Sequence, residues 1–127
     1  MSSTAIISRF FTISATPSGV EVPLLGRGEP KVNSGYIEQI IINQIMGGGT
    51  LVTLEIRYDS GNSDEDRLVY QLVDEPYSSS VPVVDSKIRG PFSMLNTDVG
   101  PDLFLYVAPN ASGILQIRVD MEMHKFN

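Results

Sequence analysis

Residues 114–124 read ILQIRVDMEMH, and from Leu115 to His124 apolar and polar side chains alternate without interruption. The apolar face consists of Leu115, Ile117, Val119, Met121 and Met123. The polar face consists of Gln116, Arg118, Asp120, Glu122 and His124. Such alternation is typical of an antiparallel β-strand whose sheet has one face covered by a second layer. The stretch therefore predicts a strand with Ile117 and Val119 in the core of two packed sheets.

The same reading, extended along the chain, predicts further short strands at 5–14, 36–45, 51–58, 67–73 and 103–107, with weaker candidates at 20–25, 81–84 and 87–94, the last two broken by Pro82 and Pro91. Residues 103–107 (LFLYV) are apolar on both faces, which is typical of a buried central strand. Gly47–Gly49 suits a tight turn, so 36–45 and 51–58 are expected to form a hairpin. Pro109–Gly113 is expected to make a second hairpin with the last strand.

These strands, with turn signals at short intervals, predict an all-β fold, namely an antiparallel β-sandwich of jelly-roll or Greek-key type with seven to eight short strands. The 127 residues fit a single domain spanning 1–127 with one core.

Composition excludes several classes of function. The chain has fifteen Asp and Glu, nine Lys and Arg, and no Cys, with a formal net charge of −6. That charge repels nucleic acid unless Arg9, Arg27 and Lys31 gather on one face, so we expect no nucleic-acid partner. Without Cys there is no thiol nucleophile and no cysteine zinc site. No apolar run is long enough to span a bilayer and the N-terminus lacks the pattern of a secretory signal, so we expect no membrane partner.

The acidic segment 59–66 (DSGNSDED) is the sharpest candidate for a metal site, because it offers several of the oxygen ligands that calcium prefers. Its spacing does not match a helix-loop-helix calcium loop, and Asp98 or Asp102 would have to join from other loops. We therefore favour a solvated hairpin turn, and we expect neither a metal nor a cofactor.

Catalytic residues are sparse. His124 is the only histidine and lies near the C-terminus on a polar strand face, where a base would be poorly held. Gly26 and Gly28 lack the third glycine and the lysine of a phosphate-binding loop. We therefore expect no enzyme. Tyrosines at 36, 58, 70, 77 and 106 leave a sugar-binding platform as an alternative, although core or rim positions explain them more simply.

The N-terminal segment is the candidate protein interface. Ile6, Ile7, Phe10 and Phe11 give the first strand more apolar side chain than one sheet face can bury, and 17–30 is rich in Pro and Gly. We predict that 1–35 forms an N-terminal strand and an extended assembly arm, and that its removal over 1–30 leaves a folded species of lower order. The alternative is that the first strand is central in its own sandwich. The predicted interface residues are Ile6, Ile7, Phe10, Phe11, Val20, Val22 and Leu24.

Three stretches together carry a resemblance to a known class of protein. They are VNSGYIEQIIINQIMGGGTLVTLEIRYDS (32–60), PVVDSKIRGPFSM (82–94) and GPDLFLYVAPNASGILQIRVDMEMH (100–124). In strand and turn placement this arrangement resembles the small β-sandwich structural proteins of tailed bacteriophage particles, over about residues 33 to 124.

The resemblance implies a virion structural protein, above all a head decoration (cement) protein that stabilises a phage head, with a small tail or head-tail connector subunit as the alternative. It implies partners among the major capsid protein and neighbouring virion subunits, and a homo-oligomer with a trimer favoured. It also implies that the chain is made in the host cytoplasm and ends up in the virion. A sugar- or calcium-binding β-sandwich module is the remaining alternative.

Overall fold

The computed structural model describes residues 2–25, 34–58, 68–86, 89–93 and 103–126. Nine strands follow one another in these ranges: β1 (Ser2–Ala15), β2 (Val20–Leu25), β3 (Ser34–Gly47), β4 (Leu51–Tyr58), β5 (Leu68–Pro76), β6 (Val83–Asp85), β7 (Arg89–Ser93), β8 (Leu103–Pro109) and β9 (Gly113–Phe126). The described residues contain no helix, and so none that is long and apolar enough to cross a membrane.

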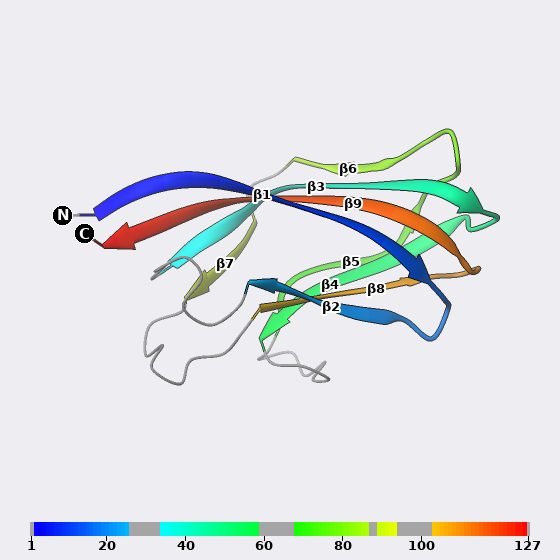
Figure 1. The fold of residues 1–127 in the computed structure, drawn as a ribbon, viewed down its shortest axis with the longest axis horizontal. Coiled ribbons are helices and arrows are strands. Elements are labelled where there is room, and N and C mark those ends of the chain that lie inside the picture. Colours follow the sequence, from blue (N-terminus) through cyan, green and yellow to red (C-terminus); the bar gives the residue numbers. More distant parts are fainter. Residues whose placement is uncertain (1, 26–33, 59–67, 87–88, 94–102, 127) are drawn as a thin grey trace.

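The strands form two antiparallel sheets that lie one above the other (Figure 1). One sheet has the order β1-β9-β3-β6 and is called the β1 sheet below; the other has the order β2-β8-β4-β5 and is called the β2 sheet. Strand β7 pairs with Ser34–Ile37 of β3 and β6 with Ile40–Ile42, so the two short strands share one position at the sheet edge. This order is that of a jelly roll, which confirms the predicted β-sandwich.

The two predicted hairpins are wrong, because each of these connections crosses from one sheet to the other. Strand β3 pairs with β9, β6 and β7, whereas β4 pairs with β5 and β8. Likewise β8 lies in the β2 sheet and β9 in the β1 sheet. Gly, Pro and Asn serve a hairpin turn and a short crossing equally well, so the turn residues alone did not distinguish the two.

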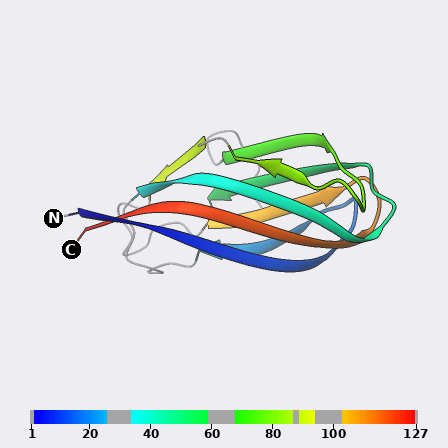
Figure 2. The same ribbon diagram turned by 90° about the horizontal axis from the view of Figure 1, so that it is seen from above.

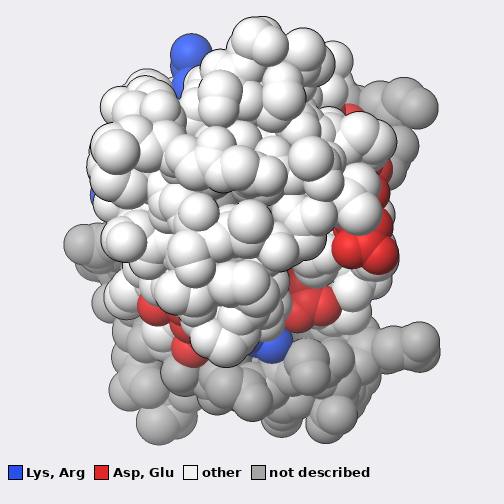
Figure 3. Space-filling model, turned by 90° about the vertical axis from the view of Figure 1, so that its right-hand side faces the viewer, with Lys and Arg blue, Asp and Glu red and all other residues white. Residues whose placement is uncertain are grey.

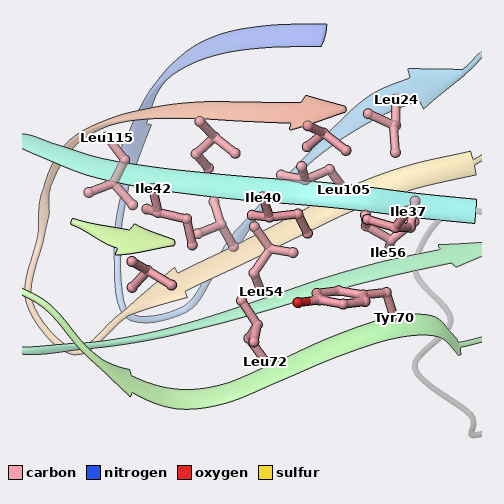
Figure 4. Close-up of a cluster of buried hydrophobic side chains, with 14 of the residues drawn as sticks. Leu24, Ile37, Ile40, Ile42, Leu54, Ile56, Tyr70, Leu72, Leu105 and Leu115 are labelled. Carbon is pink, nitrogen blue, oxygen red and sulfur yellow. The ribbon is translucent and has the colours of Figure 1, made fainter. Parts of the chain in front are cut away.

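The core lies between the two sheets and is built from alternate residues of the central strands (Figure 4). From the β1 sheet come Ile37, Ile40, Ile42, Leu115, Ile117, Val119 and Met121, and from the β2 sheet Val52, Leu54, Ile56, Leu103, Leu105 and Val107, all buried. The predicted inner face of 114–121 is therefore confirmed, as is the central position of β8.

Strand β1 is an edge strand of the β1 sheet, and Figure 2 shows it lying beside β9 along its whole length. Four of its residues face the core: Ile13 and Ala15 are buried, and Ile7 and Phe11 pack against the core. Ile6 and Phe10 face outward and are exposed. The pairs of adjacent apolar residues thus divide between the two faces of one strand.

Candidate interaction surfaces

One end of the sandwich, called the uncharged end below, consists of four of the connections that join strands of different sheets: 16–19, 48–50, 77–82 and 110–112. None of these residues is Asp, Glu, Lys or Arg. Figure 3 looks onto this end, where uncharged residues fill the centre of the surface. The sequence of the segments 26–33 and 59–67, by contrast, contains eight charged residues, Arg27, Glu29, Lys31, Asp59, Asp64, Glu65, Asp66 and Arg67.

A buried amide holds the β3–β4 crossing in place. The Gln44 side chain donates from Nε2 to the Gly49 carbonyl oxygen at 3.0 Å and accepts at Oε1 from the Gly49 backbone N–H at 2.8 Å. Gln44 follows Ile40 and Ile42 on the inner face of β3, where a buried polar side chain has to find partners. It satisfies both of its polar atoms on a single backbone residue and thereby fixes the turn.

A second amide joins two of the crossings to each other. Asn110 Oδ1 accepts from the backbone N–H groups of Thr50 at 2.8 Å and Leu51 at 3.1 Å, and Asn110 Nδ2 donates to Thr50 Oγ1 at 2.9 Å. The Asn110 N–H donates in turn to the Leu51 carbonyl oxygen at 2.9 Å. Four hydrogen bonds therefore hold the 110–112 connection against residues 50–51, and none of them involves a charged group.

Tyr77 packs under the same crossing. Its backbone N–H donates to the Thr50 carbonyl oxygen at 3.0 Å, and its buried hydroxyl has no hydrogen-bond partner in the part of the chain that the structure describes. Burial raises the pKa of the Tyr77 phenol above its ordinary value of 10.0. A Cβ at Gly49 would come within 2.6 Å of the Tyr77 hydroxyl oxygen, whereas a Cβ at Gly48 would meet nothing within 4 Å.

Three exposed apolar side chains lie on or beside the uncharged end. Met46, at the end of β3, is 61% exposed, and Val81, in the 77–82 connection, is 59% exposed. Ile45 is exposed beside Met46. This end therefore presents a rigid surface with apolar projections, which is the composition of a surface that another protein covers.

The outer face of the β1 sheet carries an apolar row that crosses the sheet from edge to edge. Phe10 of β1 stands opposite Arg118 of β9, Arg118 opposite Ile41 of β3, and Ile41 opposite Val84 of β6. Phe10 is 70% exposed and Val84 is also exposed. A groove of about 330 Å³ runs along this row and is lined by Phe10, Phe11, Thr12, Ile41, Asn43, Gln116, Ile117 and Arg118.

A charged pair lies beside this row on the same face. Arg118 Nε lies 2.9 Å from Asp120 Oδ1, and the same carboxylate oxygen accepts from the Ser8 hydroxyl at 2.6 Å. The Arg118 guanidinium also lies over the Phe10 ring, 5.5 Å from its centroid. Arg118 therefore joins the charged pair to the apolar row.

The outer face of the β2 sheet is different, because a buried ionic cluster occupies it. Arg57 Nη2 lies 3.2 Å from Glu21 Oε2, and Arg57 Nη1 lies 3.3 Å from Glu55 Oε1. Gln71 Nε2 donates to Glu55 Oε2 at 2.8 Å, and the Arg57 guanidinium stacks 4.4 Å from the centroid of the Tyr106 ring. Strands β2, β8, β4 and β5 each contribute a side chain, so the cluster ties this sheet together across its whole width.

The predicted interface residues divide into two groups. Ile6 and Phe10 are exposed, whereas Ile7 and Phe11 pack against the core. Leu24 is buried, and Val20 and Val22 pack against the core because β2 pairs with β8. This corrects the expectation of a free arm over 20–25, where the chain is strand β2 of its own sandwich. Pro23 is tolerated because it lies at an irregular position of an edge strand.

Other predicted features fall on separate parts of the molecule. The acidic segment 59–66, Asp98, Asp102, Gly26 and Gly28 lie outside the described residues. The described residues include no group of three or more His, Asp or Glu that could hold a metal ion. Backbone pairing places His124 of β9 opposite Thr4 of β1.

The five tyrosines do not share one surface. Tyr70 and Tyr77 are buried, and Tyr58 packs against the core. Tyr36 lies on the β1 sheet, and Tyr106 stacks on Arg57 in the β2 sheet. They therefore form no common platform for a sugar.

Comparison with known proteins shows the fold. No protein-family model and no curated protein sequence matches the chain. Among solved structures, it is similar to a chain of the Bacillus endospore appendages, described as disulfide-linked pili, with a TM-score of 0.58, 9% identity, and coverage of 99% of this chain and 92% of that chain. It is also similar to the VP2 protein of Infectious Bursal Disease Virus, with a TM-score of 0.54, 10% identity and 98% of this chain covered. The chain spans 32% of VP2.

Three features of these surfaces were not predicted from the sequence. Gln44 follows Ile40 and Ile42 on the inner face of β3, so a polar residue stands where the alternation predicts an apolar one. That departure was the signal in the sequence for a buried, hydrogen-bonded amide. Asn110 lies in a turn sequence, PNASG, that gives no indication of its partner sixty residues away. The Arg57 cluster depends on which strands become neighbours, and alternation within single strands does not contain that information.

Proposed function

We propose that the protein is a structural subunit of a virus particle. The observation that carries the proposal is the uncharged end, a surface that is rigid, free of charged residues and flanked by exposed apolar side chains. The jelly-roll fold supports it, because jelly rolls are common in viral capsid domains, and VP2 of Infectious Bursal Disease Virus, similar in fold, forms particles.

Covering a surface costs free energy in proportion to the charge and the conformational freedom that the surface loses. Charged side chains lose hydration when a partner covers them, so the centres of interfaces are depleted of charge. Gln44 and Asn110 fix the crossings in the free subunit, so little conformational freedom is lost when a neighbour docks there. The uncharged end thus meets both requirements of a subunit contact.

The finer assignment follows the resemblance to tailed-phage structural proteins. We propose a head decoration (cement) protein that binds the major capsid protein, with a small tail or head-tail subunit as the alternative within the same class. On the particle, a trimer is the favoured arrangement, because capsid decoration sites commonly lie on threefold or quasi-threefold axes; this arrangement on the shell is separate from the pairing of free chains proposed below. The exposed groove beside Phe10 offers a second place where a neighbouring subunit can insert a side chain.

Mass spectrometry of density-banded particles from cells that make this protein tests the class of function. The expected result is that the chain bands with the major capsid protein at a fixed ratio, and cryo-microscopy of those particles then shows where it sits. Recovery of the chain only from the soluble fraction would overturn the proposal.

Two valines provide a matched test of the proposed contact surface. Val81 lies on the uncharged end and is 59% exposed, and Val73 lies on the outer face of the β2 sheet and is 57% exposed. Val81→Lys should reduce incorporation into particles by at least tenfold, whereas Val73→Lys should be incorporated normally, with equal melting temperatures for both. Equal incorporation of the two variants would show that the uncharged end is not the contact.

A fibre subunit is the second candidate. The likeness to the Bacillus endospore appendage chain, which covers most of both chains, favours it. Because this chain contains no Cys, such a fibre would hold together without disulfides. Negative-stain microscopy of the purified protein distinguishes the candidates: filaments formed by the protein alone favour the fibre, and discrete species that join only preformed shells favour the virion subunit.

Calcium addition tests the remaining alternative of a ligand-binding module. A ligand that binds only the native state raises the melting temperature. We expect millimolar calcium to leave the melting temperature unchanged. A rise of several degrees that disappears in the double variant Asp64→Ala, Asp66→Ala would place a calcium site in the acidic segment and favour the module.

A further inference from the structure

The outer edge of β1 is a fourteen-residue strand edge that, in the part of the chain that the structure describes, has no partner strand. We propose that two copies of this protein pair through this edge, antiparallel and about a two-fold axis at Ser8, so that their β1 sheets join into one continuous sheet. This inference does not rest on the proposed virion role.

The edge lacks most of the features that normally prevent such pairing. Natural edge strands are protected by proline, bulges, lysines, inward-pointing charges or short length. Strand β1 contains no Pro and no Lys, and it pairs with β9 from Ser2 to Ala15 without a register shift. Its one charged residue, Arg9, is partly buried and takes part in an interaction within the subunit, so it is the one protective feature that this strand carries. The backbone groups along this edge are therefore accessible to a partner strand of matching length.

Side-chain pairing then selects the partner and the register. In an antiparallel pair, residues that stand opposite each other project on the same face, so even-numbered residues of β1 have to face even-numbered ones. With Ser8 opposite Ser8 of a second copy, the exposed Ile6 of each copy stands opposite the exposed Phe10 of the other. The two largest outward side chains of β1 thus cover each other twice, which makes the strand complementary to itself.

Charge decides against the neighbouring register. A two-fold axis at Arg9 would give the same length of pairing, but it would place the two Arg9 residues directly opposite each other and would leave Phe10 opposite Ser8. Like charges directly opposite destabilise an antiparallel pair. With the axis at Ser8, Arg118 and Phe10 of one copy share a row with Ile6 and Glu122 of the other, because Phe10 faces Arg118 and Ile6 faces Glu122. Opposite charges therefore flank the apolar contact on both sides.

A single cysteine tests the register, because the chain contains no other. In an antiparallel pair the two Cα atoms at the axis lie about 4.5–5.5 Å apart, within the range of about 4.4–6.8 Å that a disulfide requires. Mild oxidation of Ser8→Cys should convert most of the protein to a covalent dimer. Ser14→Cys is the matched control, on the same exposed face of β1. In this register its two thiols would lie roughly 40 Å apart and should not cross-link.

Sedimentation tests the association itself. The unmodified chain should sediment as a dimer that dissociates on dilution. Ile6 and Met46 are both 61% exposed on the β1 sheet, but only Ile6 lies on β1. Ile6→Lys should therefore weaken the dimer at least tenfold, while Met46→Lys should leave it intact, and neither should change the melting temperature.

Each contrary result overturns the pairing. A chain that stays monomeric at high concentration, a trimer as its only assembly, an Ile6→Lys variant that dimerises normally, or equal cross-linking of Ser8→Cys and Ser14→Cys would each do so. None of these results bears on particle incorporation, which is measured through Val81. Failure of the pairing and failure of the proposed function are therefore distinguishable.

Discussion

The outer faces of the two sheets use an arginine in opposite ways. On the β2 sheet, the side chain of Arg57 is only 7% exposed and lies between Glu21, Glu55 and the Tyr106 ring. On the β1 sheet, the side chain of Arg118 is 45% exposed and contacts one carboxylate, that of Asp120. One arginine joins four strands into a closed cluster, whereas the other lies beside an open apolar row.

The difference indicates which face is available to a partner. Charges that are buried and mutually paired cannot be uncovered or re-paired without a large cost, so the cluster on the β2 sheet serves the fold. An exposed apolar row next to an unpartnered strand edge gains free energy when a second protein covers it. Of the two outer faces, we therefore propose that of the β1 sheet for association, in addition to the uncharged end, and the variants below test the distinction between the faces.

Val119→Asp should have the largest effect, since it tests the assignment of inner and outer faces on which the comparison depends. Val119 is fully buried, and its replacement would place an unpaired charge in the core. We expect a loss of at least about 4 kcal/mol, enough to abolish soluble folding. Arg118→Ser, one residue away on the outer face, should remain soluble. Solubility and circular dichroism are the measurements, and equal tolerance of both variants would reverse the faces.

Arg57→Ala against Arg118→Ala compares the two arginines directly. Removal of Arg57 leaves Glu55, which is buried, with Gln71 as its remaining partner, and should cost about 3–5 kcal/mol. Removal of Arg118 leaves Asp120, which is as buried as Glu55, with Ser8 as its remaining partner, but Arg118 itself is 45% exposed, so we expect a smaller loss of about 1–3 kcal/mol. Urea unfolding of the three proteins provides the values. Similar costs for both variants would mean that the cluster on the β2 sheet is no more closed than the pair on the β1 sheet.

Gly49→Ala against Gly48→Ala tests the crossings that hold the two sheets in a fixed relation. A methyl group at position 49 would collide with the Tyr77 hydroxyl and approach Gln44 Oε1 at 3.0 Å, so we expect a loss of about 1–3 kcal/mol. A methyl group at position 48 meets nothing and should change stability by less than about 1 kcal/mol. Thermal unfolding measures both, and a loss at Gly48 as large as that at Gly49 would contradict the described crossing.

Tyr77→Phe should have the smallest effect. The hydroxyl has no hydrogen-bond partner in the described part of the chain, so its removal should change stability at neutral pH by less than about 1 kcal/mol. Burial raises the pKa of Tyr77, so the neutral phenol is favoured in the folded state and stability is lost as pH rises above 10.0. Tyr77→Phe should show less of this alkaline loss in urea unfolding, and an identical alkaline loss in both proteins would contradict the assignment.

Much of the fold could be predicted from alternation within strands, and the connections between strands could not. The series from Leu115 to Met121 is buried as predicted because one sheet face meets the core along the whole of β9. The crossing after Gly47 was predicted as a hairpin because turn residues carry no information about which sheet the next strand joins. That choice depends on contacts distant in sequence, such as the pairing of β3 with β9.

The candidate surfaces were predictable to a similar extent. The excess of apolar residues in β1 was visible in the sequence, and its outward half, Ile6 and Phe10, is exposed. Leu24 was assigned to an interface because Pro and Gly surround it, but strand pairing with β8 buries it. Deletion of residues 1–30 is therefore now expected to unfold the protein, since it would remove two strands that contribute to the core.

The pairing of the first strand with the last has a consequence for how the protein folds. Ser2 stands opposite Phe126 and Ala15 opposite Gly113, so β1 finds its partner only when nearly the whole chain is present. Closing so long a loop precedes any gain from the contact, and all-β domains dominated by distant pairings fold in milliseconds to seconds. During synthesis, at about 5–20 residues per second, β1 with its Ile6 and Phe10 side chains remains without its partner strand β9 for several seconds. Soluble yield should therefore depend on the rate of synthesis and on chaperone supply, even where the finished sandwich is stable.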